Sequence, residues 1–168
     1  MSPRVVLVGL PGSGKSTIGR RLAHALNVPL VDSDQAIETL YSGRSCGEVL
    51  TTLGEKDFRT VEADVIADAL HGEGVLALGG GAVVTEVTRQ RLMDHEVVFL
   101  DISVDEGVKR TSRTNSRPLL DVPDPQKKYQ ELYDQRRDLY LEVASYSVKC
   151  DGKNPRRVVT DILNYIDN

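Results

Sequence analysis

Several features that would mark a disulfide-rich or membrane-spanning protein are missing from this sequence. The two cysteines, Cys46 and Cys150, are too few and too isolated for a disulfide framework or a zinc site, so we expect ordinary reduced thiols and assign them no role. No apolar run approaches the roughly 18 residues that span a bilayer. The run near the N-terminus is too short for a signal peptide. We therefore expect a cytoplasmic protein with no membrane partner.

The charge pattern argues against a nucleic-acid partner. The formal net charge is −4, and no stripe of lysine and arginine interleaved with aromatic residues occurs. Low-complexity tracts and internal repeats are also missing. What is present is an ordinary globular composition over 168 residues, which predicts one domain, residues 1–168. We expect a monomer whose partner is a small molecule.

Short strand-like runs alternate with helical patterns along the chain. The runs that predict strands cover residues 5–8, 30–31, 75–78, 97–100 and 147–150. Helix starts are indicated by Ser103 with Glu106, a capping-box pattern, and by Asn154 followed by Pro155. This alternation predicts an α/β fold, with a parallel sheet covered by helices on both faces and ligands at the carboxyl ends of the strands.

The segment GLPGSGKST, residues 9–17, follows the first predicted strand and precedes a helical pattern. It fits the P-loop pattern GxxxxGK[ST] in the context that the pattern requires. The glycines let backbone N–H groups turn toward phosphates at the positive end of the next helix. Lys15 is then expected to neutralise the β- and γ-phosphates, and Ser16 to bind Mg²⁺. The segment predicts a nucleoside triphosphate site.

Two carboxylates, Asp32 and Asp34, end the second predicted strand. They lie two residues apart and so point to one side if the strand geometry persists. One can serve the metal and the other an acceptor hydroxyl. The alternative is that Ser33 or Asp34 only caps the next helix, from Gln35 onward, and the two roles could coexist.

Further glycines and arginines extend the candidate site. Residues 79–81 are three consecutive glycines, which give a ligand bare backbone to approach, although a plain loop is an alternative. Arg117 precedes a break rich in proline and aspartate, which predicts a mobile lid that carries an arginine. Arg136 falls in a long helical pattern over about residues 126–144, where a solvated face is the alternative.

Taken in order, these segments resemble the shikimate kinases over nearly the whole chain. The likeness rests on the glycine loop, Asp32-Ser33-Asp34, Glu55-x-x-Phe58-Arg59, Gly79-Gly80-Gly81, Arg117-Pro118-Leu119-Leu120 and Arg136. It implies a single-domain P-loop kinase of the nucleoside-monophosphate-kinase type, with a five-stranded parallel sheet and a mobile lid over about residues 112–125. The implied reaction is Mg²⁺-dependent transfer of the ATP γ-phosphate to the 3-hydroxyl of shikimate, in the pathway to chorismate and aromatic amino acids.

The resemblance also implies a role for each matched residue. Asp34 would orient or deprotonate the acceptor hydroxyl, Arg59 and Arg136 would clamp the shikimate carboxylate, and Gly79, Gly80 and Gly81 would line the same pocket, with about residues 33–62 as the acceptor-binding helical segment. Ser16 would bind Mg²⁺ directly and Asp32 through water. Lys15, Asp34 and Arg117 would be catalytic. The residues implied to bind ATP are Gly12, Ser13, Gly14, Lys15, Ser16, Thr17, Arg110, Arg117, Lys153 and Pro155.

The chain departs from the family pattern at a few positions. Val49-Leu50 stand where an Ile-Phe pair is usual, Lys153 where a member can have arginine, and Cys46 where an aliphatic residue is usual. Two other functions stay open. A gluconate-type kinase would also take a polyhydroxy carboxylate, and a nucleotide-dependent switch or regulatory ATPase would need no acceptor at all. An adenylate kinase would instead take a nucleotide acceptor.

Overall fold

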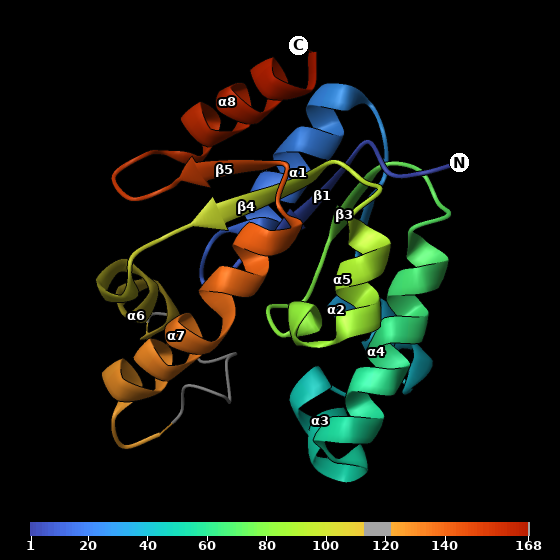
Figure 1. The fold of residues 1–168 in the computed structure, drawn as a ribbon, viewed down its shortest axis with the longest axis vertical. Coiled ribbons are helices and arrows are strands. Elements are labelled where there is room, and N and C mark those ends of the chain that lie inside the picture. The colour runs from blue at the N-terminus through green and yellow to red at the C-terminus, as the bar shows by residue number, and fades with distance from the viewer. Residues whose placement is uncertain (113–121, 168) are drawn as a thin grey trace.

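A computed structural model describes residues 1–112 and 122–167. Its centre is a parallel five-stranded sheet in the order β2-β3-β1-β4-β5 (Figure 1). The strands are β1 Val5–Val8, β2 Leu30–Asp32, β3 Val75–Ala77, β4 Val97–Asp101 and β5 Tyr146–Lys149. The predicted parallel α/β sheet is confirmed. Strand ends differ from the prediction by about one residue, because residues 147–150 were expected where β5 covers Tyr146–Lys149.

The central strands are buried on both faces. All four residues of β1 and all three of β3 are buried, and β1 pairs in register with β3 at Val5 and Val75 and with β4 at Val6 and Val97. Continuous apolar runs are typical of parallel strands that helices cover on both sides. Leu78 extends the β3 ladder by one bond, since its N–H donates to the Leu7 carbonyl at 3.1 Å.

Helices surround the sheet, with α1 packed against α8 and α5 packed against α4 and α7 (Figure 1). The helices are α1 Lys15–Leu26, α2 Ser33–Leu40, α3 Cys46–Leu53, α4 Glu55–Ala69, α5 Glu86–Leu92, α6 Val104–Ser112, α7 Pro125–Val143 and α8 Pro155–Asp167, with a short 3-10 helix η1 at Ala82–Val84. In the described ranges, 1–112 and 122–167, no helix is both long and apolar enough to cross a bilayer.

The α2–α4 region has a small core of its own. Ile37, Val49 and Phe58 come from α2, α3 and α4 and are buried together, apart from the main core around the sheet. Leu50 is partly buried against this cluster, so the Val49-Leu50 pair that departs from the family pattern packs in it. This cluster holds the three helices together, and α2 also contacts β2, the edge strand of the sheet. Figure 1 shows α2, α3 and α4 close together.

Hydrogen bonds at the helix starts agree with the two predicted caps and identify a different cap at α2. Ser103 Oγ accepts from the Glu106 N–H at 3.2 Å, and Asn154 Oδ1 accepts from the Arg157 N–H at 2.9 Å. The alternative that Ser33 or Asp34 caps a helix from Gln35 does not hold. The helix begins at Ser33, and the Asp32 carboxylate caps it, because an extended backbone at Asp32 turns its side chain toward the first N–H groups.

Candidate active site

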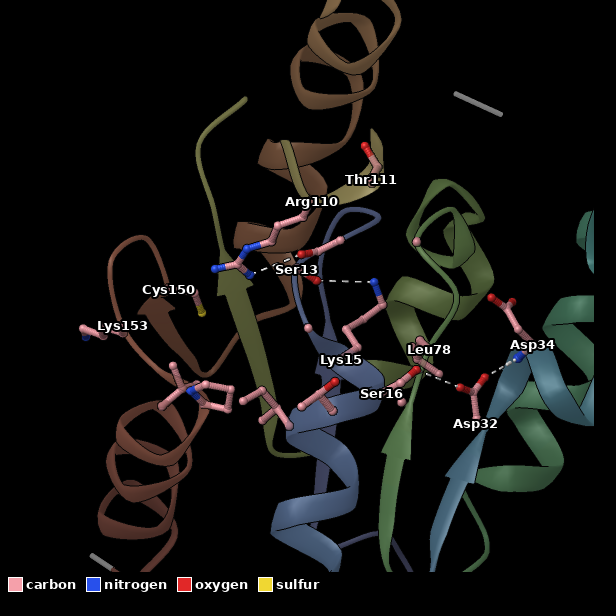
Figure 2. Close-up of a pocket in the computed structure, with 18 residues that line it drawn as sticks. Ser13, Lys15, Ser16, Asp32, Asp34, Leu78, Arg110, Thr111, Cys150 and Lys153 are labelled. Carbon is pink, nitrogen blue, oxygen red and sulfur yellow. Dashed lines mark hydrogen bonds between the residues drawn. The ribbon is translucent and has the colours of Figure 1, made fainter. Parts of the chain in front are cut away.

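A cleft of about 470 Å³ opens at the carboxyl ends of the central strands (Figure 2). This is where a parallel sheet with helices on both faces binds its ligands. In Figure 2, Asp32 and Asp34 lie on one side of Lys15, and Arg110, Cys150 and Lys153 on the other. The residues predicted for nucleotide and metal that line the cleft are Gly12, Ser13, Gly14, Lys15, Ser16, Thr17, Asp32, Arg110, Lys153 and Pro155.

The glycine loop turns directly into α1. Gly12 and Gly14 have φ values of 82° and 98°, a left-handed region that glycine enters at little cost. Gly14 is the N-cap residue of α1 and has no side chain to satisfy the first N–H groups of the helix. Those groups, at the positive end of a helix that starts with Lys15, form an anion-binding terminus.

The Lys15 ammonium folds back over its own loop. It donates to the Gly9 carbonyl at 2.7 Å and to the Leu10 carbonyl at 3.2 Å, and it lies 3.4 Å from Ser13 Oγ (Figure 2). These contacts hold one positive charge over the start of α1, beside the cleft. An anion that enters the loop would meet this ammonium and the α1 N–H groups together.

Asp32 joins the loop to the second strand. Its Oδ2 accepts from Ser16 Oγ at 3.4 Å, while its Oδ1 accepts from the N–H groups of Asp34 at 2.9 Å and Gln35 at 3.3 Å (Figure 2). One carboxylate therefore caps α2 and also faces Ser16. Among the described residues, no group of three or more His, Cys, Asp or Glu side chains could hold a metal alone. A cation at Ser16 and Asp32 would need phosphate oxygens and water to complete its shell.

Asp34, Arg59 and Arg136 converge on the three consecutive glycines. A Cβ atom on Gly79 would collide with the Asp34 carboxylate, and one on Gly81 would collide with the Arg59 guanidinium. A Cβ atom on Gly80 would lie 3.5 Å from Arg136 Nη1. Side chains at positions 79 and 81 would therefore displace charged groups from the pocket. Bare backbone is what allows one carboxylate and two guanidinium groups from α2, α4 and α7 to meet here.

Arg59 is held by two carboxylates on its own helix. Its Nε and Nη1 lie 2.9 Å from Glu55 Oε1 and Glu62 Oε1, and Glu62 is only 2% exposed. Burial raises the pKa of Glu62, although the Arg59 charge opposes this. Burial by itself would lower the pKa of Arg59, but Glu62 and Glu55 together outweigh it and raise that pKa. Arg59 therefore stays charged and points its free edge toward Gly81.

Arg136 is buried, which excludes the alternative of a solvated helix face. It is 6% exposed, and its Nε has no hydrogen-bond partner in the part of the chain that the structure describes. A buried guanidinium N–H without an acceptor is energetically unfavourable, which makes this group a natural contact for an anionic ligand. The neighbouring Arg137 points elsewhere and pairs with Asp101 at 3.0 Å.

The opposite side of the cleft contains the residues expected to flank the base. Arg110 Nη1 donates to the Gly12 carbonyl at 3.2 Å, and its Nε pairs with Glu106 at 2.9 Å. Lys153 pairs with Asp161 at 3.3 Å at the other end of this wall. Arg117 and most of the expected lid, residues 113–121, lie outside the described residues.

Reasoning from the sequence gave no role in this site to three residues that the structure places in or beside it. Cys46 Sγ donates to the Asp34 carbonyl at 3.4 Å, and burial followed by the Asp34 charge raises the pKa of its thiol. Cys150 lines the base side of the cleft, and burial raises its pKa to about 11. Ser33 Oγ accepts from the Gly79 N–H at 3.0 Å and so ties α2 to the glycines. The two cysteines lie outside the matched motifs, and Ser33 lies within Asp32-Ser33-Asp34 but was given no role in the pocket.

A P-loop at the head of a parallel sheet, with a pocket of buried charge beside it, defines the class of P-loop phosphotransferases. The family model described as shikimate kinase matches residues 11–167. The chain is 59% identical to the shikimate kinase of Corynebacterium jeikeium, over 99% of this chain and 90% of that one. Its identity to the shikimate kinase of Corynebacterium diphtheriae is 56%, over 98% and 95% of the two chains.

A solved structure agrees with these relatives. Shikimate kinase from Acinetobacter baumannii in complex with shikimate has a TM-score of 0.91 and 36% identity, covering 99% of this chain and 93% of that one. The chain belongs to the shikimate kinase family.

Proposed function

We propose that this chain transfers the γ-phosphate of ATP to the 3-hydroxyl of shikimate and releases ADP and shikimate 3-phosphate. Family membership supports an ATP-dependent kinase that acts on a hydroxyl group. The single observation that carries the choice of acceptor is the convergence of Asp34, Arg59 and Arg136 on the three glycines, beside the P-loop. In that pocket, the guanidinium groups of Arg59 and Arg136 can bind the carboxylate of a ligand, and the carboxylate of Asp34 can accept a hydrogen bond from a ligand hydroxyl.

The donor half of the site comprises the glycine loop, Lys15 and Ser16. The N–H groups at the start of α1 bind the phosphates, and the Lys15 ammonium exchanges its carbonyl partners at Gly9 and Leu10 for phosphate oxygens. Ser16 Oγ and Asp32 Oδ2 are hard oxygen donors 3.4 Å apart at the cleft, a set that fits Mg²⁺. Ser16 and, through water, Asp32 would hold Mg²⁺, which would supply positive charge to the phosphates.

The acceptor half comprises Asp34, Arg59, Arg136 and the glycines at residues 79–81. Arg59 and Arg136 clamp the shikimate carboxylate, because a planar guanidinium gives a carboxylate two parallel charged hydrogen bonds. The unpartnered Nε of Arg136 gains an acceptor when the ligand binds. Asp34 accepts a hydrogen bond from the attacking hydroxyl and orients it toward the γ-phosphate. A loose transition state needs such positioning more than a strong base.

Other parts of the proposal rest on the family resemblance. Arg117, on a lid over about residues 112–125, would add positive charge at the transferring phosphoryl group. Arg110, Lys153 and Pro155 would flank the adenine, and the α2–α4 unit would correspond to the acceptor segment at about residues 33–62. We further propose a single domain that works as a cytoplasmic monomer, with shikimate as its partner and neither a nucleic acid nor a membrane.

The experiment that best tests the proposed function is a comparison of possible phosphate acceptors. ADP release would be measured by a coupled assay with shikimate, gluconate, AMP or no acceptor. We expect fast release only with shikimate. Fast release with gluconate would identify a gluconate-type kinase, and fast release with AMP an adenylate kinase. Equal release with no acceptor would identify a regulatory ATPase or switch and reject the proposed function.

A further inference from the structure

Two buried tyrosines of α7 reach backbone carbonyls in different halves of the site. Tyr129 Oη donates to the Pro11 carbonyl in the glycine loop at 2.8 Å. Tyr140 Oη donates to the Gly80 carbonyl in the three-glycine segment. Both tyrosines are fully buried. Neither belongs to a motif or touches the expected position of a reacting atom, so neither has a role in the proposed chemistry.

One face of α7 aligns these tyrosines with Arg136. The buried residues of the helix are Tyr129, Leu132, Arg136, Tyr140 and Val143, at spacings of three and four. Arg136 therefore lies between the two tyrosines on the face that packs against the site. The helix α7 therefore carries Arg136 and also contacts the glycine loop and the three-glycine segment.

The surrounding packing fixes each tyrosine ring. A Cβ atom on Gly107 of α6 would collide with the hydroxyl end of Tyr129, so a glycine there leaves the space that the ring fills. The Tyr140 ring stacks on Phe99 of β4 at a centroid distance of 5.1 Å. Burial raises the pKa of Tyr140 well above its usual range, although the charge and hydrogen bond of Arg136 oppose this. The hydroxyl therefore stays protonated and can donate.

The two carbonyls belong to segments that touch each other. A Cβ atom on Gly80 would lie 3.4 Å from Pro11 Cδ and 3.5 Å from both Arg136 Nη1 and the Gly9 carbonyl oxygen. Gly80 is therefore the contact point between the donor loop and the acceptor pocket. Each side of this contact is anchored to α7 by its own tyrosine hydroxyl. In-line transfer needs the two substrates at a fixed separation, so the relative position of these two segments matters for the proposed reaction.

We propose that Tyr129 and Tyr140 are positioning residues, and that each supports the binding of a different substrate. Tyr129 holds the glycine loop in place for ATP, and Tyr140 holds Gly80 and Arg136 in place for the acceptor. The assignment of Tyr140 rests on the proposed function, whereas that of Tyr129 needs only a nucleotide. Removal of either hydroxyl leaves one buried carbonyl without its donor and lets that segment shift, while the ring and its packing remain.

Ligand titrations of Tyr129→Phe and Tyr140→Phe test this division of roles. Tyr133→Phe is the matched control, because Tyr133 lies on the same helix and its ring faces Arg137 at 5.8 Å. We expect Tyr140→Phe to raise the Kd and KM for shikimate about tenfold, with ADP affinity changed less than about twofold. Tyr129→Phe should do the reverse, and Tyr133→Phe should change neither. Thermal unfolding of all three variants monitors the fold.

The pattern of effects decides the outcome. Equal weakening of both ligands in each variant, or loss of thermal stability with both affinities retained, would mean that the tyrosines only stabilise the fold and would overturn the proposal. If the parent protein binds ADP but not shikimate, the proposed function fails, and with it the role of Tyr140. The ADP titration of Tyr129→Phe still decides the role of Tyr129 in that case.

A double-mutant cycle supplies an independent measurement. Tyr140→Phe and Arg136→Lys should be non-additive in shikimate affinity, because both act on the segment at Gly80. Tyr129→Phe and Arg136→Lys should be additive within about twofold. Additivity in the first cycle would contradict a role of Tyr140 in placing Arg136.

Discussion

The proposed donor and acceptor halves of the site are built in opposite ways. The donor half is one stretch of chain, residues 9–17, in which a turn and the first residues of α1 supply nearly every group. The acceptor half takes its side chains from α2, α4 and α7 and its floor from the segment after β3. A contiguous site depends on local backbone geometry, whereas a dispersed site depends on the packing of the whole fold.

The two halves also differ in how their charges are held. Lys15 rests on the carbonyls of its own loop at the edge of the cleft. Arg59 and Arg136 are largely buried, with Glu62 buried between charged neighbours. Buried charge is costly unless it is paired, so the proposed acceptor half is suited to an anionic ligand. Substitutions in one half should therefore leave binding to the other largely intact.

The largest effect is expected in the acceptor half. Arg136→Ala removes a buried cation from the proposed carboxylate clamp. It should lower kcat/KM for shikimate by an amount that corresponds to a loss of roughly 2 to 5 kcal/mol in transition-state stabilisation. The affinity for ADP should stay nearly unchanged. Arg137→Ala is the control, because that neighbour pairs with Asp101 instead. Steady-state kinetics measure kcat/KM, and direct titration measures the affinity of each variant for shikimate and for ADP. Loss of ADP binding in Arg136→Ala would place this arginine in the donor half.

In the donor half, Lys15→Met keeps side-chain length but removes the charge expected on the β- and γ-phosphates. Turnover should fall by at least about a hundredfold, with the fold and shikimate affinity intact. Lys149→Met, on the exposed side of β5, is a control that should leave turnover near the parent value. A folded Lys15→Met protein with near-normal kcat would remove the P-loop from the mechanism.

The buried carboxylate makes stability in the acceptor half depend on pH. Burial keeps the pKa of Glu62 in the folded chain above its ordinary value of 4.5, so the folded state binds this proton more tightly than the unfolded state. The resulting stabilisation is present below about pH 4.5 and is lost as pH rises through the folded-state pKa. Relative to Glu62→Gln, the parent should therefore lose free energy of unfolding, by up to about 1.4 kcal/mol per pH unit in that window.

Denaturant unfolding of both proteins between about pH 4 and pH 7 measures this difference. A difference that is flat with pH, or that grows in favour of the parent as pH rises, would contradict a buried carboxylate with a raised pKa at position 62.

The smallest effects concern the two thiols, one in each half. Burial raises the pKa of Cys150 from 9.0 to about 11, so its thiolate population near pH 8 should be about a hundredth of that of an ordinary cysteine. Cys46, beside Asp34, should also react slowly. Mass spectrometry after N-ethylmaleimide treatment should show that shikimate protects Cys46 and ADP protects Cys150. If ADP protects Cys46 and shikimate protects Cys150 instead, the assignment of each thiol to its half of the site is wrong.

The contrast between the halves also explains what the sequence could predict. The strands at residues 5–8 and 97–100 are continuous apolar runs, and the loop at residues 9–17 is defined by spacing alone, so local pattern is sufficient there. β5 is half-exposed, and a weak alternation placed it one residue late. The cap at α2 is Asp32 rather than the alternatives Ser33 or Asp34, because sequence does not show which of three adjacent polar residues turns back toward the helix.

In the acceptor half, the roles of Arg59 and Arg136 were accessible only through the family resemblance. Glu55, Arg59 and Glu62 lie at helical spacing, which predicts that they pair but not that Glu62 is buried. Arg136 shares a helix face with Tyr129 and Tyr140, and that periodicity could have indicated burial. The role of an arginine at such a position cannot be inferred until the elements packed against it are known. The hydrogen bonds of the tyrosines span 118 and 60 residues, beyond any local pattern.

The most direct test of the central claim is the identity of the product. Phosphorus NMR of a reaction with ATP, Mg²⁺ and shikimate shows where the phosphate goes. The proposed function predicts one new phosphate monoester, on the 3-hydroxyl of shikimate, formed in equal amount to ADP. Inorganic phosphate in place of that ester, or a phosphate on another hydroxyl, would contradict it.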